Sequence, residues 1–189
     1  MKIVFTGAPS SGKTTVFDIL KNEKYCGFEY INEQVREISH FWDMDDEDKQ
    51  YTAFRFQENI EKGKENFISD RSAIDVYIYS IITKIENEVL LTDVYNHSKK
   101  YDLIIFFSPV SNFVPDGFRT DTQKEFNDEF ENQFRGDNRI YYVKGKSING
   151  RVKEIKTLIT LTMKMNDVQR AKSLMDYMIK GKIKKGDVW

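Results

Sequence analysis

The sequence predicts an α/β fold, in which a mostly parallel sheet of five strands carries helices on both faces. Short apolar runs alternate along the chain with longer stretches that have apolar residues at helical spacing. A glycine-rich turn joins the first run to the first stretch. The chain has 189 residues, 40% of them hydrophobic, which suits one domain with a substantial core. We expect residues 1–165 to form that domain, and residues 166–189 to add an amphipathic helix and a basic tail.

The turn after the first apolar run has a sequence typical of phosphate binding. Residues 2–6 form the expected strand, and the next eight residues fit the pattern G-x-x-x-x-G-K-[ST]. Glycines let backbone N–H groups surround a polyphosphate, and the following helix adds the positive end of its dipole. Lys13 can reach the β- and γ-phosphates of ATP, and the Thr14 hydroxyl can ligate Mg²⁺.

The fold class is therefore that of a P-loop NTPase, with ATP and Mg²⁺ as the expected cofactors. The residues expected to contact the nucleotide are Gly7, Ala8, Pro9, Ser10, Ser11, Gly12, Lys13, Thr14 and Thr15.

Four more apolar runs complete the predicted sheet. Residues 28–31 and 66–70 are short runs of aromatic and β-branched residues, and the second ends on an acid. Residues 101–107 are the most apolar run of the chain, which indicates a buried strand that Ser108 and Pro109 terminate. Residues 139–143 form the last predicted strand.

The helices are predicted from apolar residues that recur on one side. Five helical stretches lie within the predicted domain, at residues 14–21, from about 43 to 64, 73–84, 86–97 and 147–165. An acidic cluster at residues 43–48 opens the second of them, and we interpret it as a cap because acids favour the positive end of a helix dipole. The polar and aromatic residues 110–137 receive no helix or strand.

Charged residues follow several strands, at the sheet edge where an α/β fold places its ligand. Glu33 and Arg36 follow the second strand, Asp70 and Arg71 follow the third, and Arg119 lies beyond the fourth. Phosphoryl transfer needs a metal, a base and cations for the transferred group. We expect Asp70 to hold Mg²⁺ together with Thr14, Glu33 to accept the proton of a substrate hydroxyl, and the arginines to bind phosphoryl oxygens.

Structural interpretations of the same residues stay open. Glu33 and Arg36 are three residues apart and could form a solvated helix pair. Asp70 could cap the helix that follows it, and Arg71 could pair with Asp75 on a helix surface.

This set of motifs resembles the small P-loop kinases that include ribosylnicotinamide kinase, a family also described as an AAA-type ATPase domain. The resemblance covers roughly residues 1–161, and the Glu-x-x-Arg and Asp-Arg-Ser steps are also similar to deoxynucleoside and thymidylate kinases. It implies that Glu33 or Asp70 is the catalytic base and that Arg71 binds the acceptor. It also implies a lid at about residues 113–137, from which Arg119 reaches the phosphates.

Two residues of the predicted second helix are candidates for recognising an acceptor base. Phe54 could stack on a base and the Gln57 amide could pair with its edge, and the two share one side of the helix. The alternative, which we favour, is an aromatic stripe that faces the core.

We therefore expect an ATP-dependent kinase that phosphorylates a nucleoside or a nucleoside monophosphate. One alternative is a kinase for a hydroxyl of DNA or RNA, with the lysines of residues 180–185 holding the polymer. Another is a nucleotide-hydrolysing switch or ATPase, although the Asn-Lys-x-Asp guanine motif is absent.

Composition and apolar run length argue against several other classes of protein and of site. A net charge of −1 gives no general affinity for nucleic acid. One cysteine, Cys26, cannot form an internal disulfide and is expected to be buried. With two histidines besides, no zinc cluster can be built without carboxylates. No apolar run approaches the ~18 residues that cross a bilayer. The first strand begins at residue 2, so we expect no signal peptide and a cytoplasmic protein, with monomer and homodimer both open.

Overall fold

The computed structural model describes residues 1–33, 35, 38, 40–109 and 121–164, and its centre is a five-stranded sheet. The strands lie in the order β2-β3-β1-β4-β5, and every neighbouring pair is parallel. The predicted α/β class is thus confirmed, with a sheet that is entirely parallel in the described residues. The strands are β1 (Lys2–Thr6), β2 (Glu29–Ile31), β3 (Phe67–Asp70), β4 (Leu103–Phe106) and β5 (Ile140–Tyr142).

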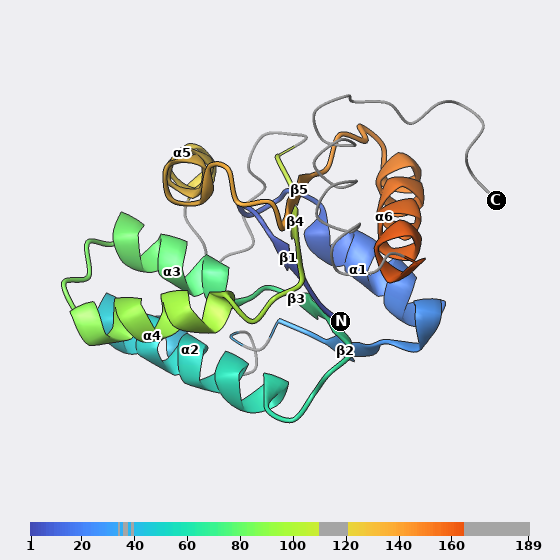
Figure 1. Cartoon of the computed structure of the whole chain (residues 1–189). Coiled ribbons are helices and arrows are strands. Elements are labelled where there is room, and N and C mark those ends of the chain that lie inside the picture. Colours follow the sequence, from blue (N-terminus) through green and yellow to red (C-terminus); the bar gives the residue numbers. More distant parts are fainter. Residues whose placement is uncertain (34, 36–37, 39, 110–120, 165–189) are drawn as a thin grey trace.

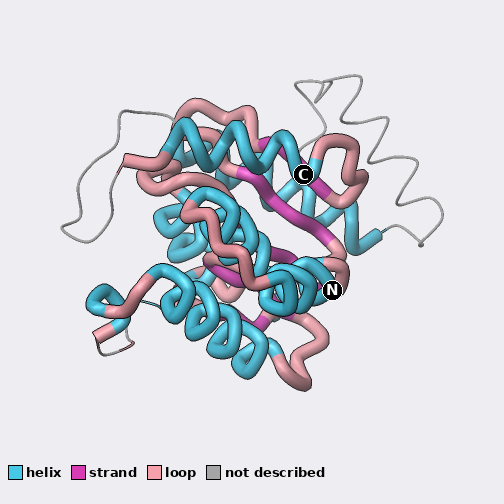
Figure 2. Tube along the Cα trace, turned by 90° about the vertical axis from the view of Figure 1, so that its left-hand side faces the viewer, coloured by secondary structure: helices cyan, strands magenta, loops and turns pink. Residues whose placement is uncertain are grey.

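Helices cover both faces of this sheet (Figure 1). One face carries α1 (Lys13–Asn22) and α6 (Ile148–Lys164). The other face carries α2 (Asp46–Glu61), α3 (Ala73–Ile82), α4 (Glu88–Ser98) and α5 (Gln123–Phe134). Figure 2 views the molecule from this second side, where the helices lie in front of the strands. None of the described helices has the length and apolar character needed to cross a membrane.

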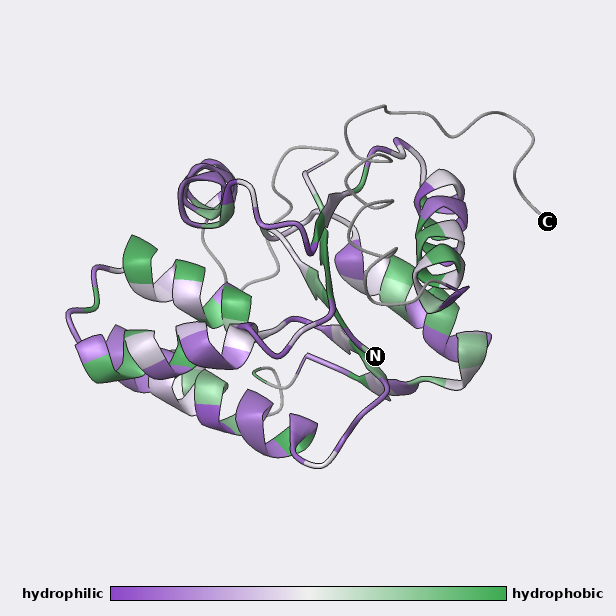
Figure 3. Cartoon of the chain, in the orientation of Figure 1, coloured by the Kyte–Doolittle hydropathy of each residue, from purple (hydrophilic) through white to green (hydrophobic). Residues whose placement is uncertain are grey.

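Alternating side chains on the strands divide the core into two layers. Val4 of β1 packs into the cluster beneath α2 to α5, whereas Ile3 and Phe5 pack into the cluster beneath α1 and α6. This alternation follows from the two-residue period of a strand, because both faces of a parallel sheet are buried. The hydrophobic colouring of the strands and of the helix sides that face them follows the same pattern (Figure 3).

The acidic cluster before α2 is a helix cap, as the sequence predicts. The Asp45 carboxylate accepts a hydrogen bond of 2.8 Å from the Asp48 backbone N–H. Three further acids, Asp46, Glu47 and Asp48, lie in the first turn, where the helix dipole favours negative charge.

Helix α5 is absent from the sequence prediction, which assigned no element to residues 110–137. Phe126, Phe130 and Phe134 recur every four residues and are all buried, and Phe130 stacks on Phe106 of β4 with ring centroids 4.1 Å apart. This aromatic stripe anchors the second part of the predicted lid to the core. The first part, which includes Arg119, lies outside the described residues.

The predictions for Cys26 and for residues 166–189 are not confirmed. Cys26 is exposed, in a short turn where its φ is +55°, so the prediction that it is buried is wrong. The amphipathic helix and basic tail predicted for residues 166–189 lie outside the described residues.

The Phe130 contact leads to a prediction on stability. Phe130→Ala should lower the free energy of unfolding by about 3–5 kcal/mol, because it opens a cavity between α5 and the sheet. Urea denaturation followed by circular dichroism measures this change. Phe56→Ala is the matched control, since Phe56 is 48% exposed and its loss should cost about 0.5 kcal/mol. Equal losses in the two variants would contradict the packing described for α5.

Candidate active site

The phosphate-binding pattern forms a tight loop between β1 and α1. Gly7 and Gly12 have φ values of +137° and +81°, which glycine tolerates best. A Cβ atom on Gly7 would lie 2.4 Å from the Phe107 carbonyl oxygen, so only glycine fits beside β4. Gly12 caps α1 without a side chain, and the first turn of α1 has no acid. The first turn of α1 therefore contributes no negative charge of its own that would oppose phosphate binding.

Lys13 is buried and folds back onto its own loop. Its ammonium donates hydrogen bonds to the carbonyls of Gly7 at 2.6 Å and Ala8 at 2.9 Å, and to the Ser11 hydroxyl at 3.1 Å. Burial lowers the pKa of Lys13 to about 7, and the nearby Arg71 adds to this effect, while three acids oppose it. An anion placed in the loop would stabilise the charged form of this side chain.

Thr14 and Asp70 meet directly beside the loop. The Thr14 hydroxyl donates a hydrogen bond of 2.7 Å to Asp70 Oδ2, and Asp70 Oδ1 is buried without a hydrogen-bond partner. Burial raises the pKa of the Asp70 carboxyl, although Lys13 and the Thr14 bond oppose the shift. The interpretation of Asp70 as the cap of α3 does not hold, since Ser72 caps this helix in a capping box with Asp75.

Arg71 joins the loop to two carboxylates. Its guanidinium donates to the Gly7 carbonyl at 3.1 Å, to Glu33 Oε1 at 3.0 Å and to Asp75 Oδ1 at 2.7 Å. The predicted Arg71–Asp75 pair exists, but it lies in the site and not on a helix surface. Burial alone would lower the pKa of Arg71, yet the two carboxylates hold it well above its usual range.

The backbone of Arg71 is strained where it turns from β3 into α3. Its φ is +92°, a conformation that costs a non-glycine residue about 1–3 kcal/mol. The Arg71 N–H donates to the Phe5 carbonyl at 3.1 Å, and Asp75 accepts bonds from the N–H and hydroxyl of Ser72. These bonds fix the turn in the orientation that brings the guanidinium to the loop.

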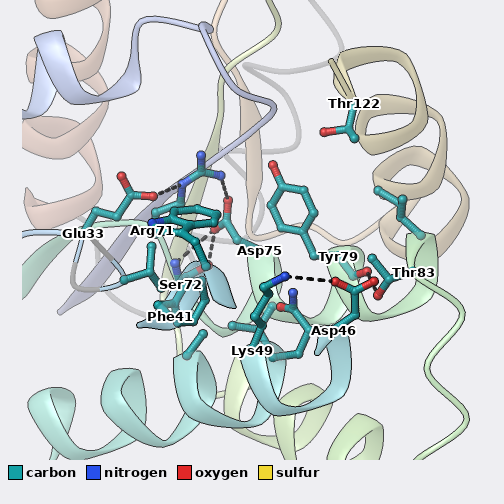
Figure 4. A pocket seen from close by; sticks show the side chains of 16 residues that line it. Glu33, Phe41, Asp46, Lys49, Arg71, Ser72, Asp75, Tyr79, Thr83 and Thr122 are labelled. Carbon is teal, nitrogen blue, oxygen red and sulfur yellow. Dashed lines mark hydrogen bonds and ion pairs between the residues drawn. The ribbon is translucent and has the colours of Figure 1, made fainter. Parts of the chain in front are cut away.

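A cavity of about 340 Å³ opens beside Arg71, between α2 and α3. Figure 4 shows Arg71 between Glu33 and Asp75, with the Tyr79 ring next to them and the Lys49–Asp46 pair farther along the cavity. The Tyr79 hydroxyl is buried and has no hydrogen-bond partner. The lining residues are Glu33, Val35, Phe41, Trp42, Asp46, Lys49, Gln50, Ala53, Arg71, Ser72, Asp75, Val76, Tyr79, Ile82, Thr83 and Thr122.

A family model for the AAA domain matches residues 2–142, which include the loop, Asp70 and Arg71. The chain belongs to the AAA domain family. None of the curated proteins matches it significantly.

Several solved structures have a fold similar to that of this AAA domain, and two of them are kinases. Deoxyadenosine kinase from M. mycoides is 16% identical with a TM-score of 0.62, over 85% of this chain and 99% of that one. Thymidylate kinase from Candida albicans is 16% identical with a TM-score of 0.63, over 87% and 94%. NadR protein, in complex with NR, is 21% identical with a TM-score of 0.61, over 82% of this chain and 52% of that one. The chain thus spans about half the length of NadR. At these identities the likeness establishes a shared fold.

The residues predicted to read an acceptor base lie elsewhere in this AAA domain. Phe54 is buried in the core with its ring edge-on to His97, and Gln57 donates to Glu61 and to Ser69 within the core. The structure thus contradicts base recognition by Phe54 and Gln57 and supports the core-facing alternative. Arg36, predicted to bind substrate, and Arg119 lie outside the described residues.

The residues that line the cavity from α2 and from the turn before it are not among the predicted site residues. Trp42 precedes α2, and Lys49, Gln50 and Ala53 occupy one side of its first half. The signal was present, because these positions have helical spacing and Gln50 carries an amide that can read a base. Phe54 and Gln57 lie one and two turns beyond Gln50 on the same side of α2, and packing alone decides which part of this side meets the cavity.

The low pKa of Lys13 leads to a prediction on pH dependence. Because its pKa is lower in the folded than in the unfolded protein, the unfolded chain binds more protons between pH 7 and about 10.4. The free energy of unfolding should therefore rise over this range relative to a Lys13→Met variant, and fall back as pH drops through 7. Urea denaturation of both proteins at matched pH values measures the difference. A difference that stays constant with pH would show that Lys13 is charged in the folded state.

Proposed function

We propose that this AAA domain is an ATP-dependent kinase that transfers the γ-phosphoryl group to a nucleoside or a nucleoside monophosphate. One observation carries the proposal: Arg71 contacts the Gly7 carbonyl of the phosphate loop and also lines the cavity. A donor bound in the loop and an acceptor bound in the cavity would meet at this guanidinium. Such proximity is what direct transfer between two substrates requires.

The loop provides the donor side of the reaction. Its backbone amides and the start of α1 suit the triphosphate of ATP, and Lys13 would exchange its bonds to loop carbonyls for the β- and γ-phosphates. Thr14 and Asp70 fit Mg²⁺, a cation that prefers oxygen ligands, because Asp70 Oδ1 is buried without a partner. The described residues contain no cluster of three or more metal-binding side chains, so the phosphates would complete the coordination. When bound, Mg²⁺ neutralises charge on the phosphate oxygens.

The cavity provides the acceptor side. The rings of Phe41, Trp42 and Tyr79 offer flat apolar surfaces for a base. The Gln50 amide can pair with a base edge, and the unpartnered Tyr79 hydroxyl can bind a polar group of the acceptor. A volume of about 340 Å³ lies within the usual range for a small-molecule site.

The two acids take different roles in this proposal. Glu33 lines the cavity and would accept the proton of the acceptor hydroxyl, whose oxygen then attacks the γ-phosphorus as ADP leaves. Asp70 contacts Thr14 and would serve the metal. Asp75 already accepts three hydrogen bonds, from Arg71 and Ser72, and would hold Arg71 in place.

The names of similar structures agree with this substrate class. The deoxyadenosine kinase was solved with dCMP and dCDP bound, and NadR protein with NR. One alternative function is a kinase for DNA or RNA, and the lysine-rich tail that would hold the polymer lies outside the described residues. The other is a nucleotide-hydrolysing switch, which no observation on the described residues favours over a kinase.

ADP release measured with ATP, Mg²⁺ and a panel of nucleosides and nucleoside monophosphates tests the proposal. At least one acceptor should raise turnover well above basal hydrolysis and appear as a phosphorylated product. Lys13→Ala should abolish this turnover because the β- and γ-phosphates lose their cation, while the exposed Lys153→Ala is the control. Stimulation by none of the panel, or full activity of Lys13→Ala, would refute the proposal.

The division of roles between the acids gives a further prediction. Glu33→Gln should lower kcat by about 10²–10⁴-fold, the range for a positioned base, with little change in the affinity for ATP. Asp70→Asn should instead raise the Mg²⁺ concentration needed for half-maximal rate. Steady-state kinetics at varied Mg²⁺ separates the two effects. If Glu33→Gln kept its rate, the role of base would pass to Asp70.

A further inference from the structure

A second buried guanidinium lies against the phosphate loop, on the sheet face opposite to the cavity. Arg151 belongs to the first turn of α6 and is only 2% exposed. It donates to three backbone carbonyls: Gly145 at 2.7 Å, Ser108 at 3.1 Å, and Ser11 within the phosphate loop. These carbonyls lie after β5, β4 and β1, so one side chain ties together three of the loops that surround the donor position.

The charge of Arg151 has no direct counter-charge among the described residues. Glu154, one turn along α6, directs its carboxylate to the backbone N–H groups of Lys144 and Gly145 and forms no ion pair with Arg151. Burial lowers the pKa of Arg151, and Glu154 only partly opposes this. A buried cation is costly unless an anion lies close by. A triphosphate in the loop would be such an anion.

The surroundings of Arg151 leave little room for it to move. A Cβ atom on Gly145 would lie 2.8 Å from the Arg151 backbone nitrogen and 3.0 Å from its Cγ. On the loop side, a Cβ atom on Gly12 would lie 3.6 Å from Arg151 Nη1. The Phe107 ring lies near the guanidinium, with its centroid 5.8 Å from Cζ. The guanidinium is thus held directly beside Gly12, the residue that caps α1.

We propose that Arg151 is a positioning residue of the ATP site. It fixes the Ser11 carbonyl so that the loop amides face the phosphates, and the bound triphosphate balances its charge. The inference rests on the proposed function only in that the loop binds ATP. It predicts an effect that grows with the number of phosphates on the ligand, which a general structural role would not produce.

Isothermal titration of AMP, ADP and ATP into wild type and Arg151→Met tests this inference. Arg151→Met should weaken ATP binding by about tenfold or more, the loss expected for hydrogen bonds to a charged group, and weaken AMP binding by less than about twofold. Arg151→Lys keeps the charge but cannot bind three carbonyls together, so its affinity for ATP should be intermediate. Gly145→Ala should also weaken ATP binding, because it displaces Arg151 without removing it.

Arg139→Met is the matched control. Arg139 also donates to backbone carbonyls, those of Ser98 and Tyr101, but it is paired with Asp137 and lies before β5, at the other end of the sheet. Its loss should reduce thermal stability and leave the affinity for all three nucleotides unchanged.

Two results would overturn the inference: wild-type affinity for ATP in Arg151→Met, or equal losses for AMP and ATP. If Arg151→Met does not fold, Arg151→Lys and Gly145→Ala decide the question in the same titrations. Failure of the proposed function would look different, since the wild-type protein itself would not bind ATP.

Discussion

The hydrogen bonds of Arg71 connect the two halves of the site. One guanidinium reaches the Gly7 carbonyl, Glu33 and Asp75, so it links the loop after β1 to the segment after β2 and to α3. The parallel order β2-β3-β1 brings these three strand ends to the same edge of the sheet. A buried charge destabilises the fold unless all of its partners are present. The loss of any one partner of Arg71 should therefore disturb the whole cluster.

Much of the surrounding structure serves to hold the start of α3. Tyr101 accepts a hydrogen bond of 3.0 Å from the Ala73 N–H and donates one of 3.0 Å to Glu61, while His97 contacts the other oxygen of Glu61 at 2.7 Å. This buried network joins α2, α4 and the entry to β4 to the turn that carries Arg71. Core residues that do not line the cavity therefore help to maintain the strained φ of Arg71.

The sequence predicts the local features of this protein well. The strands and most helices follow from the spacing of apolar residues, and the loop follows from its glycines and Lys13. The convergence of Glu33, Asp70 and Arg71 near the loop also follows, because parallel strands end at one edge. The contacts of Asp70 with Thr14 and of Arg71 with Gly7 agree with that expectation.

What the sequence misses depends on tertiary packing. Helix α5 was hidden because its three phenylalanines stand among many charged residues. Gln50 and Gln57 are seven residues apart and so lie on the same side of α2, two turns from each other. Only the packed structure shows that Gln50 meets the cavity and Gln57 meets the core. Arg151 continues the apolar stripe of α6, yet a guanidinium satisfied by carbonyls from three loops has no sequence signature.

The most direct test is a crystal structure of the protein with a non-hydrolysable ATP analogue, Mg²⁺ and a mixture of nucleosides. We expect the β-phosphate to lie in the loop and Lys13 to have left the carbonyls of Gly7 and Ala8. We also expect a nucleoside in the cavity, with a hydroxyl directed past Arg71 to the γ-phosphate. A nucleotide bound away from the loop, or a nucleoside bound outside the cavity, would contradict it.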